Sequence, residues 1–339
     1  MDAVVALDDH AGDVASLGAV SLSGQLPRAG LTLALGGLLL WLLSQRVADL
    51  DFAAVAAAIA GTAPHAWAAA AALTAIAFWA VGRYDALLHR HFETGVAPSR
   101  ARAAGISAIA VSQVLGMGMV TGAILRWRML PEQSLWQVSR LTLAVALSFL
   151  AGWAIVAGVI LLVGPAHYAW PAFGVLGLAA AGAALAVLRP NAPFRWPNLM
   201  TMSGVLGLCA LDTLAAASAL YVLLPPSMAL PFATLLPAFL LAYGAGLVSG
   251  TPGGIGAFEL ALLALLPPQS NAPILAAVIA WRLVYFVLPA LLGAAYDARH
   301  ARSSSWRVRS DLIRSDLIHW AHLPMRRICA GPQCRRKSG

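Results

Sequence analysis

The feature that most constrains the fold is a cluster of helix-breaking residues inside an apolar stretch. Residues 249–259 read Ser-Gly-Thr-Pro-Gly-Gly-Ile-Gly-Ala-Phe-Glu, within a hydrophobic segment that runs from about residue 230 to 266. A helix interior does not tolerate that density of glycine and proline. At membrane depth, non-helical backbone persists only where protein buries it or water lines it. We therefore interpret the segment as a broken or re-entrant helix at a transport or lipid-handling site.

Composition indicates an integral membrane protein. The 339 residues are 60% hydrophobic and only 11% charged, and the mean hydropathy is +0.78. Apolar stretches long enough to cross about 30 Å of hydrocarbon recur along the chain. We predict an all-α bundle of about eight transmembrane helices with broken, glycine-rich segments, and the spans are placed at about 29–45, 64–82, 103–125, 138–163, 170–188, 200–224, 229–250 and 273–296.

The distribution of charge predicts the orientation. Ten of the 22 lysine and arginine residues follow Tyr296, and residues 83–102 hold four more, whereas the 189–199 loop holds two. Cytoplasmic loops of membrane proteins are enriched in these residues. We expect a bacterial cytoplasmic-membrane protein with both termini inside. Its parts would be a short extension over 1–26, a membrane domain over 27–298 and a basic tail over 299–339.

Other classes of function find little support. The first 25 residues carry four aspartates and no lysine or arginine, unlike a secretory signal peptide. The net charge of +8 collects beside the membrane, so we expect no nucleic-acid partner. Cys209, Cys329 and Cys334 form no disulfide framework or zinc pattern. Walker A, Gly-x-Ser-x-Gly and His-Glu-x-x-His motifs are absent from the sequence, so we expect no enzyme activity, cofactor or metal.

The tail contains a tandem duplication, Arg-Ser-Asp-Leu-Ile, at residues 309–313 and 314–318. Its apolar residues could line one face of an interfacial helix. The alternative is an arginine-rich extension without a selected role, and both interpretations stay open.

A second breaker-rich segment lies in the other half of the chain. Residues 112–122 read Ser-Gln-Val-Leu-Gly-Met-Gly-Met-Val-Thr-Gly and lead to Arg126 and Arg128. Paired broken helices in two halves point to a substrate site near the middle of the bilayer. Glycines four residues apart are equally explained by helix packing. The combination of glycine, proline and a terminal charge favours a site.

Charged residues within or at the edge of the predicted spans are few: Asp85, Arg126, Arg128, Arg140, Asp212, Glu259 and Arg282. All of them except Arg140 form the candidate headgroup site, and Arg128 and Arg140 could instead lie at the membrane interface. Structural ion pairs between helices are the alternative role for each of them, because an unpaired charge is costly in a bilayer. His89 and His91 are placed in the basic loop.

Roles follow from the chemistry of these side chains. Arg126 and Arg128 could clamp a lipid phosphate, because guanidinium groups bind phosphate oxygens bidentately. Glu259 or Asp212 would neutralise that clamp when it is empty or receive a cationic headgroup, and Arg282 would supply a counter-charge to either carboxylate. If a half-helix begins near Phe258, Glu259 would alternatively cap its first turn.

The two breaker-rich segments resemble signatures of the lysylphosphatidylglycerol synthase transmembrane region. Residues 112–128 are similar to Ser-Asn-x-x-Gly-x-x-x-x-Thr-Gly-Gly-x-x-Arg-Tyr-Arg, and 252–259 look like Pro-Gly-Gly-x-Gly-x-x-Glu. The resemblance covers about residues 27–298, with departures at Gln113, Ala123 and Trp127. The matching positions also include Tyr84-Asp85, Asp212 and residues 282–289, and the motif backbone consists of Thr121, Gly122, Pro252, Gly253, Gly254 and Gly256.

The resemblance implies a function in lipid handling. In multiple peptide resistance factors this region is the flippase half, and a soluble synthase domain transfers lysine from lysyl-tRNA to phosphatidylglycerol. We expect this protein to lack such a domain. We expect a transporter-like protein that binds or translocates an aminoacylated or anionic phospholipid. The alternatives are a non-transporting partner of a separate lipid-modifying enzyme, or a truncated product of a bifunctional gene.

Overall fold

All regular structure in the described part of the chain is helical. The computed structural model describes residues 52–116, 118–164, 168–188, 199–267 and 271–301. The all-α prediction is confirmed for these ranges. The predicted span at 29–45, the extension over 1–26 and the duplicated tail lie outside them.

Five helical segments are long and apolar enough to cross a membrane. They are α3 (Pro64–His91), α6 (Leu135–Val163), Met200–Tyr221 of α8 (Leu199–Tyr221), α9 (Phe232–Ser249) and Ala272–Arg299. The last comprises α11 (Asn271–Arg282), the π-helical turn η5 (Leu283–Val287) and α12 (Leu288–Ala301). Each of these segments overlaps a predicted span. Five such helices are compatible with a multi-pass membrane protein. Two further helices are α2 (Phe52–Ala60) and α7 (Ala169–Leu188), the latter at the predicted 170–188 span.

The predicted span at 103–125 is wrong as a single helix. The chain forms α4 (Pro98–Leu115), turns at Gly116 with φ 76°, and continues as α5 (Gly118–Met129). This left-handed conformation suits glycine and ends the helix. Arg100 at the start of α4 donates to the carbonyl of Met129 at the end of α5 over 3.3 Å. Thus α4 and α5 form a hairpin that begins and ends at the same end of the molecule.

The second break forms a similar hairpin. After α9, the chain passes through the short 3-10 helix η3 (Pro252–Gly254) and turns back as α10 (Ala257–Leu265). Positive φ angles at Gly250, Gly253, Gly254 and Gly256 explain why this stretch needs so many glycines. The rings of Phe258 in α10 and Phe239 in α9 lie 5.7 Å apart, so the two arms pack together.

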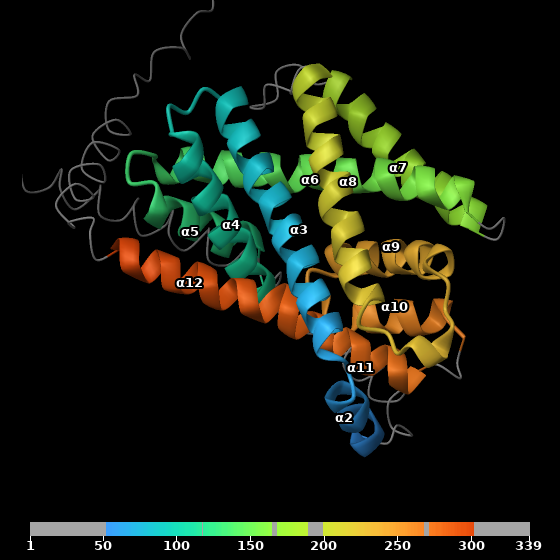
Figure 1. Ribbon diagram of the computed structural model, residues 1–339. Helices are drawn as coiled ribbons and strands as arrows, with labels where there is room; N and C mark the ends of the chain where they lie inside the picture. Colours follow the sequence, from blue (N-terminus) through green and yellow to red (C-terminus); the bar gives the residue numbers. More distant parts are fainter. Residues whose placement is uncertain (1–51, 117, 165–167, 189–198, 268–270, 302–339) are drawn as a thin grey trace, which may run out of the picture.

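The tips of the two hairpins meet inside the bundle. In Figure 1, α3 and α8 run side by side through the centre, with α4 and α5 on one side and α9 and α10 on the other. A Cβ atom added to Gly116 would lie only 2.8 Å from Cγ of Pro252. Side chains at this contact would hold the tips apart.

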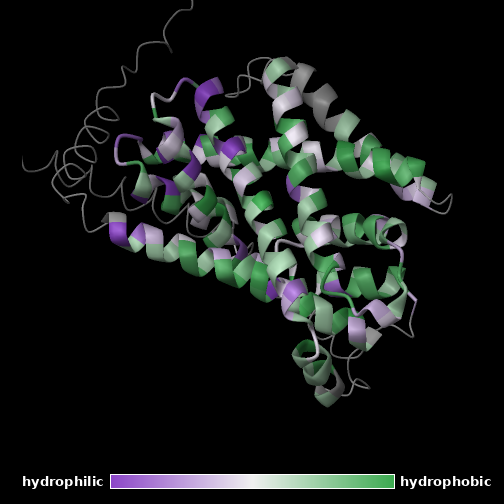
Figure 2. Ribbon diagram, in the orientation of Figure 1, coloured by the Kyte–Doolittle hydropathy of each residue, from purple (hydrophilic) through white to green (hydrophobic). Residues whose placement is uncertain are grey.

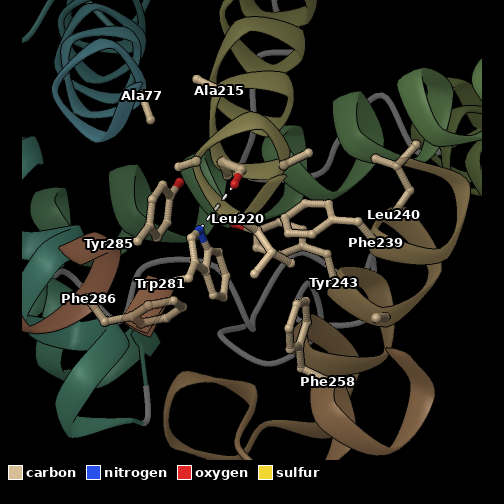
Figure 3. Packing of buried hydrophobic residues seen from close by; sticks show 14 of the residues in the cluster. Ala77, Ala215, Leu220, Phe239, Leu240, Tyr243, Phe258, Trp281, Tyr285 and Phe286 are labelled. Atoms are coloured by element: carbon tan, nitrogen blue, oxygen red, sulfur yellow. Dashed lines mark hydrogen bonds between the residues drawn. The ribbon is translucent and has the colours of Figure 1, made fainter. Parts of the chain in front are cut away.

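An aromatic cluster joins the second hairpin to α11 and α8 (Figure 3). The indole of Trp281 stacks on Phe258 at 5.2 Å and on Tyr285 at 5.1 Å. Its Nε1 donates to the carbonyl of Ala216 over 3.1 Å, which satisfies the buried donor. Because these large rings each have specific partners, the side chains in this part of the core adopt a single packing arrangement.

Polar residues gather where α3, α5 and α12 end and where α4 begins (Figure 2). We call this region the charged end. Two ion pairs link its elements: an exposed pair of Arg100 with Glu132 at 2.9 Å, and a pair of half-exposed Arg128 with buried Asp297 at 3.0 Å. The region includes residues 83–102, the basic segment that the sequence analysis predicts to be cytoplasmic.

We predict that Gly244→Ala destabilises the protein. A Cβ at Gly244 would overlap the ring of buried Trp153, and overpacking of this kind costs about 1–3 kcal/mol. Gly207→Ala in α8 is the control, because nothing lies within 4 Å of its Cβ position. Thermal unfolding in detergent should give a lower Tm for Gly244→Ala and an unchanged or higher Tm for Gly207→Ala. Equal Tm values would contradict the packing.

Candidate functional site

Two adjoining cavities lie where the hairpin tips meet. The tip cavity, of about 200 Å³, is lined by both breaks, including Gly116 and Gly253. The inner cavity, of about 490 Å³, extends among α3, α5, α6 and α8 and is lined by Arg126 and Asp212. The two spaces share lining residues, namely Ser112, Gln113, Gly118, Tyr243, Leu247 and Gly250. They therefore form a path between the two hairpins.

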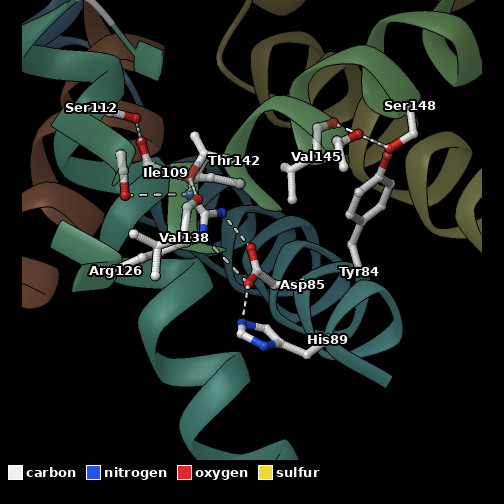
Figure 4. A network of polar contacts seen from close by, with 12 residues as sticks. Tyr84, Asp85, His89, Ile109, Ser112, Arg126, Val138, Thr142, Val145 and Ser148 are labelled. Atoms are coloured by element: carbon white, nitrogen blue, oxygen red, sulfur yellow. Dashed lines mark hydrogen bonds and ion pairs between the residues drawn. The ribbon is translucent and has the colours of Figure 1, made fainter. Parts of the chain in front are cut away.

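Arg126 is buried beside the inner cavity and pairs with Asp85 (Figure 4). Its side chain is 1% exposed, and Nη2 forms an ion pair with Oδ2 of Asp85, which is fully buried. Nη1 donates to Oγ1 of Thr142 over 3.3 Å and to the carbonyl of Gly122 over 3.5 Å. The pair ties α5 to α3 and α6, and several donors of the guanidinium are satisfied.

His89 extends this network toward the charged end. It lies in the last turn of α3 and is 2% exposed, so its predicted place in the basic loop is wrong. Nε2 lies 3.5 Å from Oδ1 of Asp85, and Nδ1 lies 2.7 Å from Oγ1 of Thr94. The spacing of four residues from Asp85 is the sequence signal for this contact.

Glu259 and Arg282 hold the second hairpin tip. Nε of Arg282 donates to Oε1 of Glu259 over 2.6 Å, and Nη1 donates to the carbonyl of Gly253 over 2.9 Å. The amide of Gly256 donates to Oε2 of Glu259 over 2.8 Å. Glu259 therefore caps α10 and binds Arg282 at once, so the predicted counter-charge and the predicted cap are both confirmed.

Asp212 does not pair with Arg282, which the sequence analysis considered as its counter-charge. Its Oδ1 accepts a hydrogen bond of 2.9 Å from the hydroxyl of Tyr285, and the residue is 3% exposed. Among the described residues, none of the ion pairs includes Asp212. It neutralises neither Arg126 nor Arg282. The carboxylate faces the inner cavity with one hydroxyl partner.

The π-helical turn η5 carries Tyr285. Five residues, Leu283–Val287, adopt the wider turn, and Pro289 follows it. Proline cannot donate a bond to the preceding turn, which favours a local change of helical register. Such turns are frequent at functional sites. The sequence reasoning did not anticipate this turn.

Arg126 and Arg128 do not act together as predicted. The side chain of Arg128 is 44% exposed and pairs with Asp297 at the charged end. Residues two apart on a helix face different directions, so one guanidinium reaches the interior and the other the exterior. The predicted phosphate clamp of two adjacent arginines is therefore not formed.

The remaining predicted positions shape the tips. The hydroxyl of Thr121 donates to the carbonyl of Gly116 over 3.0 Å, closing the first turn. A Cβ at Gly122 would lie 3.3 Å from Nη1 of Arg126. The second tip consists of Pro252, Gly253, Gly254 and Gly256.

Several polar lining residues were missed by sequence reasoning. Ser112 and Gln113 reach both cavities, and so does Tyr243. Oε1 of Gln113 is buried without a hydrogen-bond partner among the described side chains and backbone. In the sequence analysis, Gln113 appears only as a departure from a motif. The helical break that exposes Gln113 to the cavity is the sequence feature that could have identified it as a lining residue.

The site combines opposite charges with a few polar side chains along two mostly apolar cavities. Arg126 and Asp212 line one cavity, and their chemistry suits a phosphate and a cationic group respectively. Within the described ranges, no group of three or more His, Cys, Asp or Glu side chains is arranged to hold a metal ion.

Comparison with known proteins identifies a relative that is similar over most of its length. No family model matches the chain. The chain is 31% identical over 254 residues to "Uncharacterized protein slr0712" of Synechocystis sp., and the aligned region covers 67% of this chain and 76% of that protein. At this identity and coverage, the chain belongs to the same family as slr0712.

We predict strong coupling between Asp85 and Arg126. Arg126→Gln leaves a buried carboxylate without its partner, and breaking such a pair costs about 3–5 kcal/mol. The double variant Asp85→Asn/Arg126→Gln removes both charges and should recover much of the lost thermal stability. Arg100→Gln, which breaks an exposed pair, is the control and should cost about 0–1 kcal/mol. A double variant less stable than Arg126→Gln would contradict the pairing.

Proposed function

We propose that this member of the slr0712 family binds the headgroup of a polar phospholipid between its two hairpins and carries it across a bacterial cytoplasmic membrane. The observation that carries the proposal is the meeting of two interrupted helix pairs around connected cavities. Such interruptions favour substrate binding because they free backbone groups where a bilayer offers no other polar partner.

The hairpins point inward from opposite ends of the bundle. α4 and α5 begin and end at the charged end, where Arg100 contacts Met129. The start of α8 lies near the end of α3, since a Cβ at Gly204 would lie 3.0 Å from Leu87. α8 then ends away from the charged end, and its Tyr221 packs on Phe232 at the start of α9. Two re-entrant hairpins that face one another are suited to open in turn toward each leaflet.

The charges along the path support a lipid that carries both signs. Arg126 could exchange Asp85 for the phosphate of a headgroup, and Asp212 could accept an ammonium group. An aminoacylated phosphatidylglycerol has a phosphate and at least one amine, so it matches both. The resemblance of residues 112–128 and 252–259 to a lipid flippase region favours the same substrate class.

The Glu259–Arg282 pair has a positioning role in this mechanism. Arg282 holds the carbonyl of Gly253 while Glu259 holds the amide of Gly256. The pair thus fixes the Pro-Gly-Gly turn against Gly116. Movement of the second tip requires a rearrangement of these bonds.

The test is leaflet exchange in proteoliposomes. Purified protein is reconstituted with fluorescently labelled phosphatidylglycerol or lysyl-phosphatidylglycerol, and a membrane-impermeant quencher reports the fraction of label in the outer leaflet. Wild-type protein should speed the exchange of at least one lipid relative to empty liposomes. Folded wild-type protein without such exchange would overturn translocation and favour a partner role.

We predict that Asp212→Asn slows the exchange of lysyl-phosphatidylglycerol more than that of phosphatidylglycerol. Loss of one charge-assisted contact of about 1.5–3 kcal/mol corresponds to at least about a tenfold effect. Glu259→Gln should slow both lipids alike, because it loosens the tip instead of contacting the amine. Glu132→Gln makes the same chemical change at an exposed site of the charged end and serves as control. Equal effects of Asp212→Asn on both lipids would argue against Asp212 as the amine partner.

A further inference from the structure

We propose that a pocket at the charged end is a separate docking site for the phosphate of an anionic phospholipid. The pocket lies between the end of α3, the turn at 92–97, the start of α4, and α8. It deepens the proposed function by adding a place where a lipid is held before it enters the inner cavity. Its binding chemistry stands independently of translocation.

The pocket is large and basic. Its volume is about 680 Å³, and three arginines line it: Arg83, Arg90 and Arg102. Glu93 is the only acidic residue in the lining. Within the described part of the chain, none of the ion pairs includes any of these three arginines. Arg126, Arg128 and Arg282, by contrast, each have a carboxylate partner. Three guanidinium groups around one concavity are suited to a phosphate.

The backbone adds to the positive potential. Val96, Ala97 and Pro98 line the pocket where α4 begins, and the N-terminus of this 18-residue helix has no side-chain cap. A helix N-terminus contributes partial positive charge and free amide groups. This contribution reinforces the three arginines.

Neighbouring apolar surface indicates a lipid as the source of the phosphate. A further cavity of about 470 Å³ is lined by Ala75, Ile76, Trp79 and Leu211, all apolar. Trp79 belongs to both spaces and is 51% exposed. The guanidinium of Arg83 lies 4.8 Å from the centre of the Trp79 ring. Tryptophan is enriched at membrane interfaces, so an acyl chain can lie along α3 and α8 while the phosphate occupies the basic pocket.

The pocket adjoins the inner cavity, because Leu208 lines both spaces. His89 lines the pocket and contacts Asp85, the partner of Arg126. A phosphate in the pocket would therefore lie near the network that holds Arg126. This placement favours a loading site over an unrelated surface contact.

The test measures lipid binding directly. Native mass spectrometry of the detergent-solubilised protein would compare phosphatidylglycerol with phosphatidylcholine of the same acyl chains. Phosphatidylglycerol should bind more tightly to wild-type protein. Arg83→Gln/Arg102→Gln should weaken its binding by at least about tenfold, because each interfacial arginine contributes to the attraction of anionic lipid. Arg100→Gln/Arg299→Gln removes the same charge from the same end and should have little effect.

A gain of binding provides a second criterion. Glu93→Gln removes the one acidic group from the lining and should strengthen phosphatidylglycerol binding. Equal binding by wild-type, Arg83→Gln/Arg102→Gln and Glu93→Gln proteins of similar Tm would overturn the site. Competition by free glycerol phosphate at equal concentration would overturn the lipid as the source and assign the pocket to a soluble anion.

The outcomes separate this site from translocation. Selective phosphatidylglycerol binding that is lost in Arg83→Gln/Arg102→Gln, without leaflet exchange by wild-type protein, would overturn the proposed function and support the docking site. Leaflet exchange with unchanged binding in that variant would overturn the docking site alone.

Discussion

The structure depends on the close contact between two helical breaks. Gly116 meets Pro252 with no room for a Cβ atom, and Gly254 lies equally close to Gly246 in the neighbouring arm. Positive φ angles at these breaks let the chain reverse its direction at each hairpin tip. The hairpin tips therefore meet in the interior, and the cavities surround that meeting point. Free backbone groups and polar side chains are placed where the bulk of the bundle is apolar.

Buried charge pairs hold both tips in place. Asp85 on α3 binds Arg126 on the returning arm of the first hairpin, and Arg282 on α11 binds Glu259 at the start of the returning arm of the second. The returning arm of the first hairpin carries the cation of its pair, whereas the returning arm of the second hairpin carries the anion. Desolvation makes such pairs weak contributors to net stability, but loss of one partner is costly. They consequently specify where each arm lies, and in the proposed mechanism a charged headgroup would compete for them.

In the proposed mechanism, the basic pocket and the inner cavity have different roles in lipid handling. The basic pocket beside Trp79 attracts phosphate through arginines that form no ion pair with a carboxylate in the described part of the chain. The inner cavity offers a guanidinium that already has a carboxylate partner and a carboxylate that accepts a hydrogen bond from a hydroxyl. Attracting a phosphate at the surface and exchanging ion-pair partners in the interior are distinct electrostatic roles. His89 lies between them and contacts Asp85.

The sequence by itself determined the all-helical class, the apolar segments, and the interruptions near Gly116 and Pro252, because hydropathy and backbone conformational preference are local properties. It also offered Arg282 as a counter-charge for either Glu259 or Asp212, and the structure pairs Arg282 with Glu259. Only the tertiary structure decided that 103–125 is a hairpin, that Asp85 binds Arg126, and that Arg128 faces outward. Asp212 and Tyr285 are 73 residues apart, and a π-helical turn carries the hydroxyl to the carboxylate. Partners from separate helices depend on how those helices rotate and pack, which no local pattern specifies.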